Sequence, residues 1–164
     1  MTIRRLTPDD WAAFRDIRLE MLRTEPEAFG STHADWAAKP EAEIRNWLRR
    51  MHAFGLFGDA GLQACAAFGV AGGAPVRHRA SVIAVYLRPA ARGRGHTRRL
   101  LAALAAAARA DGVLQLELDV ADTNRTAIAA YERAGFVVTG AKPRALRLAS
   151  GFADAVTMIR RLDD

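Results

Sequence analysis

The stretch RPAARGRGHTRRLL, residues 88–101, decides how the rest of the chain is interpreted. It holds five arginines and two glycines, and it leads into LAALAAAARA, a run of strong helix formers. The N-terminus of a helix exposes unpaired N–H groups and the positive end of the helix dipole, and phosphates bind there. Glycine lets the backbone approach a ligand closely, and arginine adds positive charge. The stretch therefore predicts a cradle for a phosphate or pyrophosphate between a strand and a helix.

Two widespread phosphate-binding loops do not fit this stretch. The P-loop pattern GxxxxGK[ST] occurs nowhere in the chain. The dinucleotide pattern GxGxxG begins with Gly93 and Gly95 but meets Arg98 where its third glycine belongs. The strand before the loop also ends a series of strands instead of opening a βαβ unit. Both readings are excluded.

The residues before the loop predict a strand, two helices and three further strands. Thr7 and Pro8 are typical of a helix start, and apolar residues follow at helical spacing up to Leu22. Pro40 begins a second helical pattern, after a loop that contains Pro26. The predicted strands are residues 2–6, 53–59, 62–70 and 80–87, and the last three suggest an antiparallel meander.

The residues after the loop alternate between strands and helices. The helix that follows the loop ends at Asp111-Gly112, and a second helix over residues 126–134 is stopped by Gly135. Strands are predicted over residues 113–120, 136–140 and 154–162. The resulting order, β-α-α-β-β-β-α-β-α-β-β, predicts one mixed α/β (α+β) domain over residues 1–164.

The strand, loop and helix of residues 82–101 resemble the coenzyme A motif of the GNAT family of N-acetyltransferases. That motif is a strand, then [RQ]-x-x-G-x-[GA], then a helix, and Arg92, Gly95 and Thr97 occupy its three defined places. Thr97 departs from the usual glycine or alanine, although its backbone N–H can still donate.

A second motif strengthens the resemblance. NRTAIAAYERAGF, residues 124–136, is similar to the family's segment N-x-x-A-x-x-x-Y-x-x-x-G-F at the right distance downstream. The resemblance implies a GNAT-like fold, with a largely antiparallel twisted sheet of about six or seven strands and about four helices on its faces. It also implies an acetyltransferase that uses acetyl-CoA, with a primary amine attacking the acetyl group directly in a ternary complex.

The resemblance implies a set of residues that bind acetyl-CoA. The loop backbone would hold the pyrophosphate with help from arginine side chains, and the edge of the strand that ends at Leu87 would bind the pantetheine arm. The Leu87 N–H would bind the thioester oxygen as it becomes negative. Asn124 is either an N-cap only or also a contact to the cofactor arm. The expected binding residues are Val85, Leu87, Arg92, Gly93, Arg94, Gly95, His96, Thr97, Arg98, Asn124 and Tyr131.

Two residues are the expected catalytic groups. Tyr131 is the family's candidate acid for the departing thiolate, although a tyrosine at this position could also simply pack in the core. Asp119 lies where the ribosomal-protein alanine acetyltransferases carry a glutamate base. Glu117 and Glu20 are the alternative bases, and each of these acids could equally be solvated or salt-bridged.

The acceptor is expected to lie against residues 20–50 and the segment after Gly140. Acids in the first of these regions would favour a cationic amine, and Trp36 could form a wall, although the same residues could be plain surface. We expect a small-molecule amine or a peptide N-terminus as acceptor. Dimers formed through sheet edges are frequent in the family, which makes a homodimer an open possibility.

Composition limits the other function classes. The net charge of +6 would suit a nucleic-acid-binding module, but residues 103–108 of the helix after the loop offer neither basic nor stacking side chains. A family member that binds acyl-CoA as a sensor without turnover is the other alternative. The four histidines are scattered, so we expect no metal site. The lone Cys65, in an apolar strand pattern, is expected to be buried and inert. We expect no membrane segment and a cytoplasmic protein.

Overall fold

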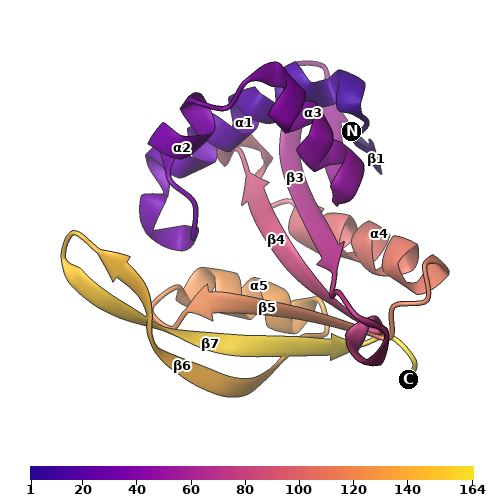
Figure 1. Cartoon of the computed structure of the whole chain (residues 1–164), viewed down its shortest axis with the longest axis vertical. Coiled ribbons are helices and arrows are strands. Elements are labelled where there is room, and N and C mark those ends of the chain that lie inside the picture. The colour runs from indigo at the N-terminus through magenta and orange to yellow at the C-terminus, as the bar shows by residue number, and fades with distance from the viewer.

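Seven strands form one sheet in the computed structural model, which describes residues 1–164 (Figure 1). The strand order is β1-β2-β3-β4-β5-β7-β6, and every neighbouring pair is antiparallel except β4 and β5, which are parallel. The strands are β1 (Thr2–Arg5), β2 (His52–Gly58), β3 (Gly61–Val70), β4 (Arg79–Leu87), β5 (Gln115–Ala121), β6 (Val137–Leu148) and β7 (Gly151–Arg161). The prediction of a mixed α/β fold with a largely antiparallel sheet, including the β2–β3–β4 meander, is confirmed.

Five α-helices cover the two faces of the sheet, one more than predicted. They are α1 (Trp11–Thr24), α2 (His33–Ala37), α3 (Glu41–Arg50), α4 (His96–Ala110) and α5 (Arg125–Arg133). The missed helix, α2, has five residues and buries only Trp36, so the sequence shows no helical period there. It forms because the Thr32 hydroxyl caps it by accepting a hydrogen bond from the Asp35 N–H at 3.1 Å.

Two hydrophobic cores lie on opposite faces of the sheet. On one face α4 contributes a stripe that includes Leu100 and Leu104, and this stripe packs on the sheet. On the other face α1, α2 and α3 pack over β2 and β3. Strand β3 is therefore buried over most of its length. Its Cys65 is buried, as predicted, and burial raises the pKa of the thiol to about 12.

Strands β4 and β5 begin side by side and then separate (Figure 1). They pair over three residues each, Arg79–Ser81 with Gln115–Glu117, and no further. Beyond that point β4 carries an irregularity, because Ala84 has a positive φ of 54° and the register with β3 shifts between Cys65 and Ala67. A bulge of this kind bends a strand and increases its twist. The edge of β4 that would face β5 is left unpaired.

The C-terminal hairpin is longer than predicted. The sequence pattern favours a strand over residues 136–140, whereas β6 continues to Leu148 and pairs with β7 along its length. Nearly all of β6 is exposed, so alternation of apolar and polar side chains does not mark its second half. Its pairing to β7 comes from partners that only the tertiary structure brings together. No helix in the structure has both the length and the apolar character that crossing a bilayer requires.

The aromatic cluster under α1 gives a test of this packing. Phe14 is fully buried, stacked on Trp47 with ring centroids 4.8 Å apart and edge-on to Trp36 at 5.8 Å. We expect Phe14→Ala to lower the free energy of unfolding by about 3–5 kcal/mol, because it removes apolar contacts and leaves a cavity. Urea titration followed by circular dichroism measures this loss. The control is Phe152→Ala on the exposed hairpin, expected to change stability by about 0.5 kcal/mol. Equal losses in the two variants would contradict the packing described.

Candidate functional site

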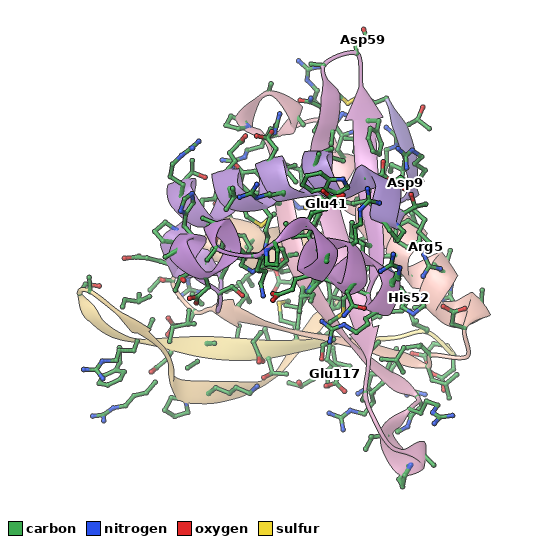
Figure 2. The ribbon with its side chains drawn as sticks, turned by 45° about the horizontal axis from the view of Figure 1, so that its top comes forward. Arg5, Asp9, Glu41, His52, Asp59 and Glu117 are labelled. Carbon is green, nitrogen blue, oxygen red and sulfur yellow. The ribbon has the colours of Figure 1, made fainter.

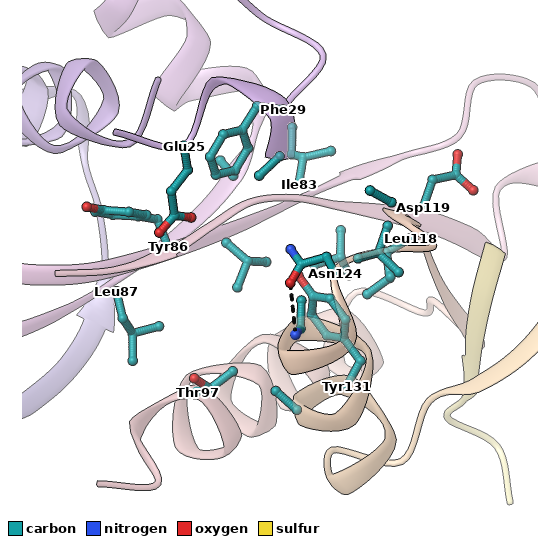
Figure 3. A pocket seen from close by; sticks show the side chains of 18 of the residues that line it. Glu25, Phe29, Ile83, Tyr86, Leu87, Thr97, Leu118, Asp119, Asn124 and Tyr131 are labelled. Atoms are coloured by element: carbon teal, nitrogen blue, oxygen red, sulfur yellow. Dashed lines mark hydrogen bonds between the residues drawn. The ribbon is translucent and has the colours of Figure 1, made fainter. Parts of the chain in front are cut away.

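A cleft opens where β4 and β5 separate. It is lined by residues 81–87 of β4 and 117–121 of β5, together with the loop before α4, one side of α5 and the segment that follows α1 (Figure 3). This is the place where two strands of one sheet expose backbone groups that no neighbouring strand satisfies. The cleft is therefore a ready site for an extended ligand that pairs with a strand edge.

The glycine-rich loop forms one end of this cleft. Gly93 and Gly95 have φ of 72° and 74°, the left-handed region that favours glycine, and Gly95 is the N-cap of the 15-residue helix α4. No atom lies within 4 Å of the place where a Cβ would stand at either glycine, so their backbone conformation, and not crowding, requires glycine. No side chain caps α4. The first N–H groups of the helix are left for an anion, beside the cleft-lining Thr97 and Arg98.

The arginine side chains of the loop take different directions. Arg92 lines the cleft with an exposed side chain that the protein itself holds, because its Nε donates to the Leu87 carbonyl at 2.9 Å and its Nη2 to Glu25 Oε1 at 2.6 Å. Arg94 is exposed and outside the cleft lining, whereas Arg98 lines it. Arg98 is therefore the loop guanidinium best placed to meet an anion at the helix N-terminus, and Arg92 serves to anchor the loop.

His96 also differs from the other loop residues. It is buried at the start of α4, outside the cleft lining, and its Nδ1 lies 3.3 Å from Arg99 Nη1. Burial and the neighbouring Arg99 lower the pKa of the His96 imidazole, which keeps the ring neutral. The side chain thus supplies no charge to the site, and only its backbone belongs to the cradle.

Tyr131 reaches the cleft from α5 (Figure 3). Its ring packs edge-on against Phe136 with centroids 5.9 Å apart, and its hydroxyl makes no hydrogen bond within the protein. Burial raises the pKa of the Tyr131 hydroxyl to about 12, so the group is a neutral proton donor at ordinary pH. The ring thus packs against the core while the residue lines the cleft, an arrangement compatible with the expected acid role, which stays a prediction.

Asn124 stands at the first turn of the same helix. Its Oδ1 accepts a hydrogen bond from the Ala127 N–H at 3.2 Å, which caps α5 (Figure 3). Asn124 also lines the cleft. The cap uses the side-chain oxygen, and this leaves the amide NH₂ as a donor toward a ligand.

The three candidate bases lie in different surroundings. The Asp119 carboxylate accepts hydrogen bonds from Lys142 Nζ at 2.5 Å and Thr157 Oγ1 at 2.6 Å, at the exposed rim of the cleft. Glu20 lies outside the cleft lining, where it accepts from the Tyr86 hydroxyl at 3.0 Å.

Glu117 lies where the cleft begins, because it is the last residue of β5 that pairs with β4. Figure 2 shows it far from Asp59, which lies in the turn between β2 and β3. Its carboxylate is held by Arg79, with Nη2 to Oε2 at 3.0 Å, and this contact lowers the pKa of the Glu117 carboxyl. A carboxylate held by an arginine in this way is a weak base. Asp119 is held by a cation too, Lys142, but of the three acids it alone combines a place in the cleft lining with an exposed carboxylate at the rim, which makes it the candidate that an incoming amine or water can reach.

The side chains of β5 divide the cleft between the two faces of the sheet. Leu116 and Leu118 belong to the core under α4, on the same side as Tyr131. Asp119 alternates with them and points to the opposite side (Figure 3). The cleft thus has a tyrosine hydroxyl on the α4–α5 side and a carboxylate on the α1–α3 side.

Two cleft residues were missed as functional candidates in the sequence. Phe29, in the segment after α1, stands over Ile83 of β4 (Figure 3). Arg18 lines the cleft from α1, and it is buried beside Trp36. The sequence did carry a signal for Arg18, which falls on the apolar stripe of α1 with Phe14 and Met21, where an arginine is unusual.

Solved structures share this architecture over nearly the whole chain. A GNAT-family acetyltransferase from Streptococcus pneumoniae is 21% identical, with 98% of each chain covered and a TM-score of 0.86. A ribosomal-protein-alanine N-acetyltransferase from Brucella melitensis is 22% identical, with 98% of this chain and 99% of that chain covered and a TM-score of 0.84. The putative acetyltransferase yncA from Salmonella typhimurium, solved with acetyl-CoA, is 22% identical, with 100% of this chain and 95% of that chain covered and a TM-score of 0.86.

The likeness to these structures concerns the fold, and no curated protein matches the chain in sequence. The sequence profile of the acetyltransferase (GNAT) family, however, matches residues 11–136. This range contains both cleft strands, the glycine-rich loop and the helix that carries Tyr131. The chain therefore belongs to the GNAT family of acetyltransferases.

Proposed function

We propose that this protein is an N-acetyltransferase in which a primary amine attacks the acetyl group of acetyl-CoA directly, with both substrates bound together. The observation that carries the proposal is the separation of β4 from β5 beside a glycine loop that opens α4. The proposal is supported by the unpaired edge of β4, the first N–H groups of α4 and the Tyr131 side chain, which all lie around this one cleft. Acetyl-CoA, the cosubstrate of the family, supplies an acetyl group activated as a thioester.

The residues of the cleft fit such a donor. The first N–H groups of α4 and the Arg98 side chain suit its phosphates. The Arg88 N–H donates to the Gln63 carbonyl at 2.9 Å, and neighbouring residues of a strand direct their N–H groups to opposite edges. The Leu87 N–H is thus directed to the open edge of β4, where it would donate to the thioester oxygen as negative charge develops.

Asp119 is the proposed base. An ammonium cannot attack a carbonyl carbon, so the amine must first lose a proton to a carboxylate, directly or through a water. Lys142 and Thr157 fix the Asp119 carboxylate, and its remaining lone pairs can accept from such a water. As the C–N bond forms and the C–S bond breaks, the amine proton passes to this carboxylate.

Tyr131 is the proposed acid on the other side of the sheet. Its hydroxyl would give a proton, or a hydrogen bond, to the departing sulfur. The absence of any hydrogen-bond partner within the protein leaves the hydroxyl available for this purpose. Proton removal and proton donation are thus assigned to opposite faces of the sheet.

The experiment that tests the function combines binding with turnover. Isothermal titration with acetyl-CoA, with ATP and short duplex DNA as controls, is expected to give micromolar binding for acetyl-CoA alone. A screen of amines for release of free thiol then identifies acceptors. Binding without thiol release for any amine would favour the acyl-CoA sensor, and tighter, salt-dependent binding of DNA would favour the nucleic-acid module.

Arg98 and Arg99 give a matched test of the anion site. Both are exposed in the first turn of α4, but only Arg98 lines the cleft. We expect Arg98→Ala to weaken acetyl-CoA binding about tenfold, because a charge-assisted contact to phosphate contributes roughly 1.5 kcal/mol. Arg99→Ala should leave the affinity within about twofold. Titration calorimetry measures both, and equal effects of the two substitutions would remove Arg98 from the site.

Removal of the Tyr131 hydroxyl tests the acid. We expect Tyr131→Phe to lower kcat about a hundredfold, which is typical of the loss of a general acid, while the ring still packs on Phe136. The thiol-release assay gives kcat, and calorimetry should show unchanged acetyl-CoA affinity. Full activity in Tyr131→Phe would show that the residue is structural only.

The pH profile of the wild-type protein checks the same assignment. An acid must be protonated to act, and with a pKa of about 12 the Tyr131 hydroxyl stays protonated below about pH 11. The rate should therefore rise as the amine and its base lose protons and then stay level through pH 10 or so. A fall in kcat between about pH 8 and 9 would contradict Tyr131 as the acid.

Asp119 is tested by an isosteric change. We expect Asp119→Asn to lower kcat/KM about a hundredfold at neutral pH, because the amide cannot accept the amine proton. The loss should shrink as pH rises and more of the amine is already neutral. Steady-state kinetics between pH 6 and 10 measure both effects, and Glu20→Gln, outside the cleft, is the control. A pH profile like that of the wild type would exclude Asp119 as the base.

A further inference from the structure

We propose that the acceptor is a free amino acid, and that Arg18 binds its carboxylate; this inference rests on the proposed function. The juxtaposition behind it is a buried, unpaired guanidinium in the wall of the acceptor side of the cleft. The acceptor would thus carry two opposite charges, an ammonium that becomes the attacking amine and a carboxylate that sets its position.

Arg18 is the most unusual charge in the protein. Arg18 is only 6% exposed, and its Nε is buried with no hydrogen-bond partner. The guanidinium forms no ion pair with any acid of the protein. Its one hydrogen bond runs from Nη1 to the Met21 sulfur at 3.2 Å, and a thioether is a weak acceptor. Burial lowers the pKa of the guanidinium, but an arginine remains charged in proteins. Buried charges in proteins are normally paired, so Arg18 lacks the anion that its burial calls for, and a ligand in the cleft is in a position to supply it.

The neighbours of Arg18 stabilise a cation without supplying an acceptor. The guanidinium lies over the Trp36 ring at 4.8 Å and 5.6 Å from the centre of the Phe29 ring. The nearest candidate for an internal counter-ion is Cys65, but its thiol is neutral and donates to the Ala84 carbonyl at 3.3 Å. Neither aromatic ring accepts a conventional hydrogen bond, Nη1 donates only to a thioether, and Nη2 has no partner in the protein, so Nη2 is free to donate to a carboxylate.

The position of Arg18 places the carboxylate on the acceptor side. Arg18, Trp36 and Phe29 all line the cleft from the α1–α3 face, the face on which Asp119 also stands. A ligand there meets a cation within the aromatic wall and acids at the rim, including Glu25. This pattern matches a molecule that carries both an amine and a carboxylate. A peptide N-terminus has an amide carbonyl at that place, so the free amino acid is favoured over a peptide.

The test compares acids with their amides. The twenty L-amino acids and their carboxamides serve as acceptors for the wild type, Arg18→Met, Arg18→Lys and Arg23→Met, the last a control on the exposed side of α1. With its best amino acid, we expect the wild type to show a kcat/KM about tenfold to a hundredfold above that with the matching amide. This ratio corresponds to the free energy of a hydrogen bond between charged groups. Arg18→Met should remove this preference by lowering the rate with the acid only, and KM for acetyl-CoA should not change. Arg18→Lys should be intermediate.

Thermal unfolding separates binding from folding. Because Arg18 is buried without a counter-ion, Arg18→Met should leave the melting temperature of the ligand-free protein equal or higher. The best amino acid should raise the melting temperature of the wild type and of Arg23→Met, but not that of Arg18→Met.

Three results would overturn the proposal: equal rates with acid and amide in the wild type, an acid preference that survives in Arg18→Met, or no amino acid that is acetylated or that stabilises the protein. Failure of the proposed function is distinguishable. In that case no amine of any kind releases thiol, while the thermal shift with amino acids still reports on Arg18.

Discussion

The short parallel pairing of β4 and β5 is the constraint on which the rest of the structure depends. After three paired residues on each strand, the bulge at Ala84 turns β4 away from β5. A sheet that stayed closed here would satisfy its own backbone groups and leave no cleft. Because it opens, one strand edge is available to a ligand, and the gap connects the two faces of the sheet. The helices on the two faces then contribute different side chains to the cleft: Tyr131 from α5 on one face, and Arg18 from α1 and Trp36 from α2 on the other.

The two sides of the cleft are mechanically linked through the end of β4. Arg92 joins the Leu87 carbonyl to Glu25, so the glycine loop is tied to the segment after α1. Tyr86 binds Glu20, and Arg88 pairs with the same carboxylate at 3.1 Å, so α1 itself is tied to β4. The arginine that opens the loop motif thus ties together two segments that line the cleft. These contacts fix the position of the glycine loop, which would bind acetyl-CoA, relative to α1, which lines the acceptor side.

The sequence predicted those parts of the structure that depend on neighbouring residues. Glycines at 93 and 95 and the spacing from Asn124 to Phe136 are local features, and they located the loop before α4 and the helix α5, which both border the cleft. The directions of the Arg92 and His96 side chains were not predictable, because their partners come from tertiary contacts: Glu25 for Arg92, and the packing that buries His96. The second half of β6 was missed for the same reason, since its pairing with β7 needs no apolar alternation. Local pattern thus gave the donor side of the site, while the acceptor side depended on contacts between distant elements.

The two cationic features of the cleft differ in their electrostatic cost, and this difference suits two different roles. Arg98 and the helix N-terminus are solvated, so their charge costs little in the free protein and their contacts to phosphate are screened. Arg18 is buried among aromatic rings, where charge is poorly solvated and attraction to an anion is screened much less. A solvated cradle accepts any ligand with phosphates of the right shape. A buried guanidinium rejects every ligand that lacks an anion at one position, because such a ligand leaves the charge unpaired. If Arg18 binds the acceptor as proposed, selectivity for the acceptor would follow from the same burial that makes Arg18 costly to the fold.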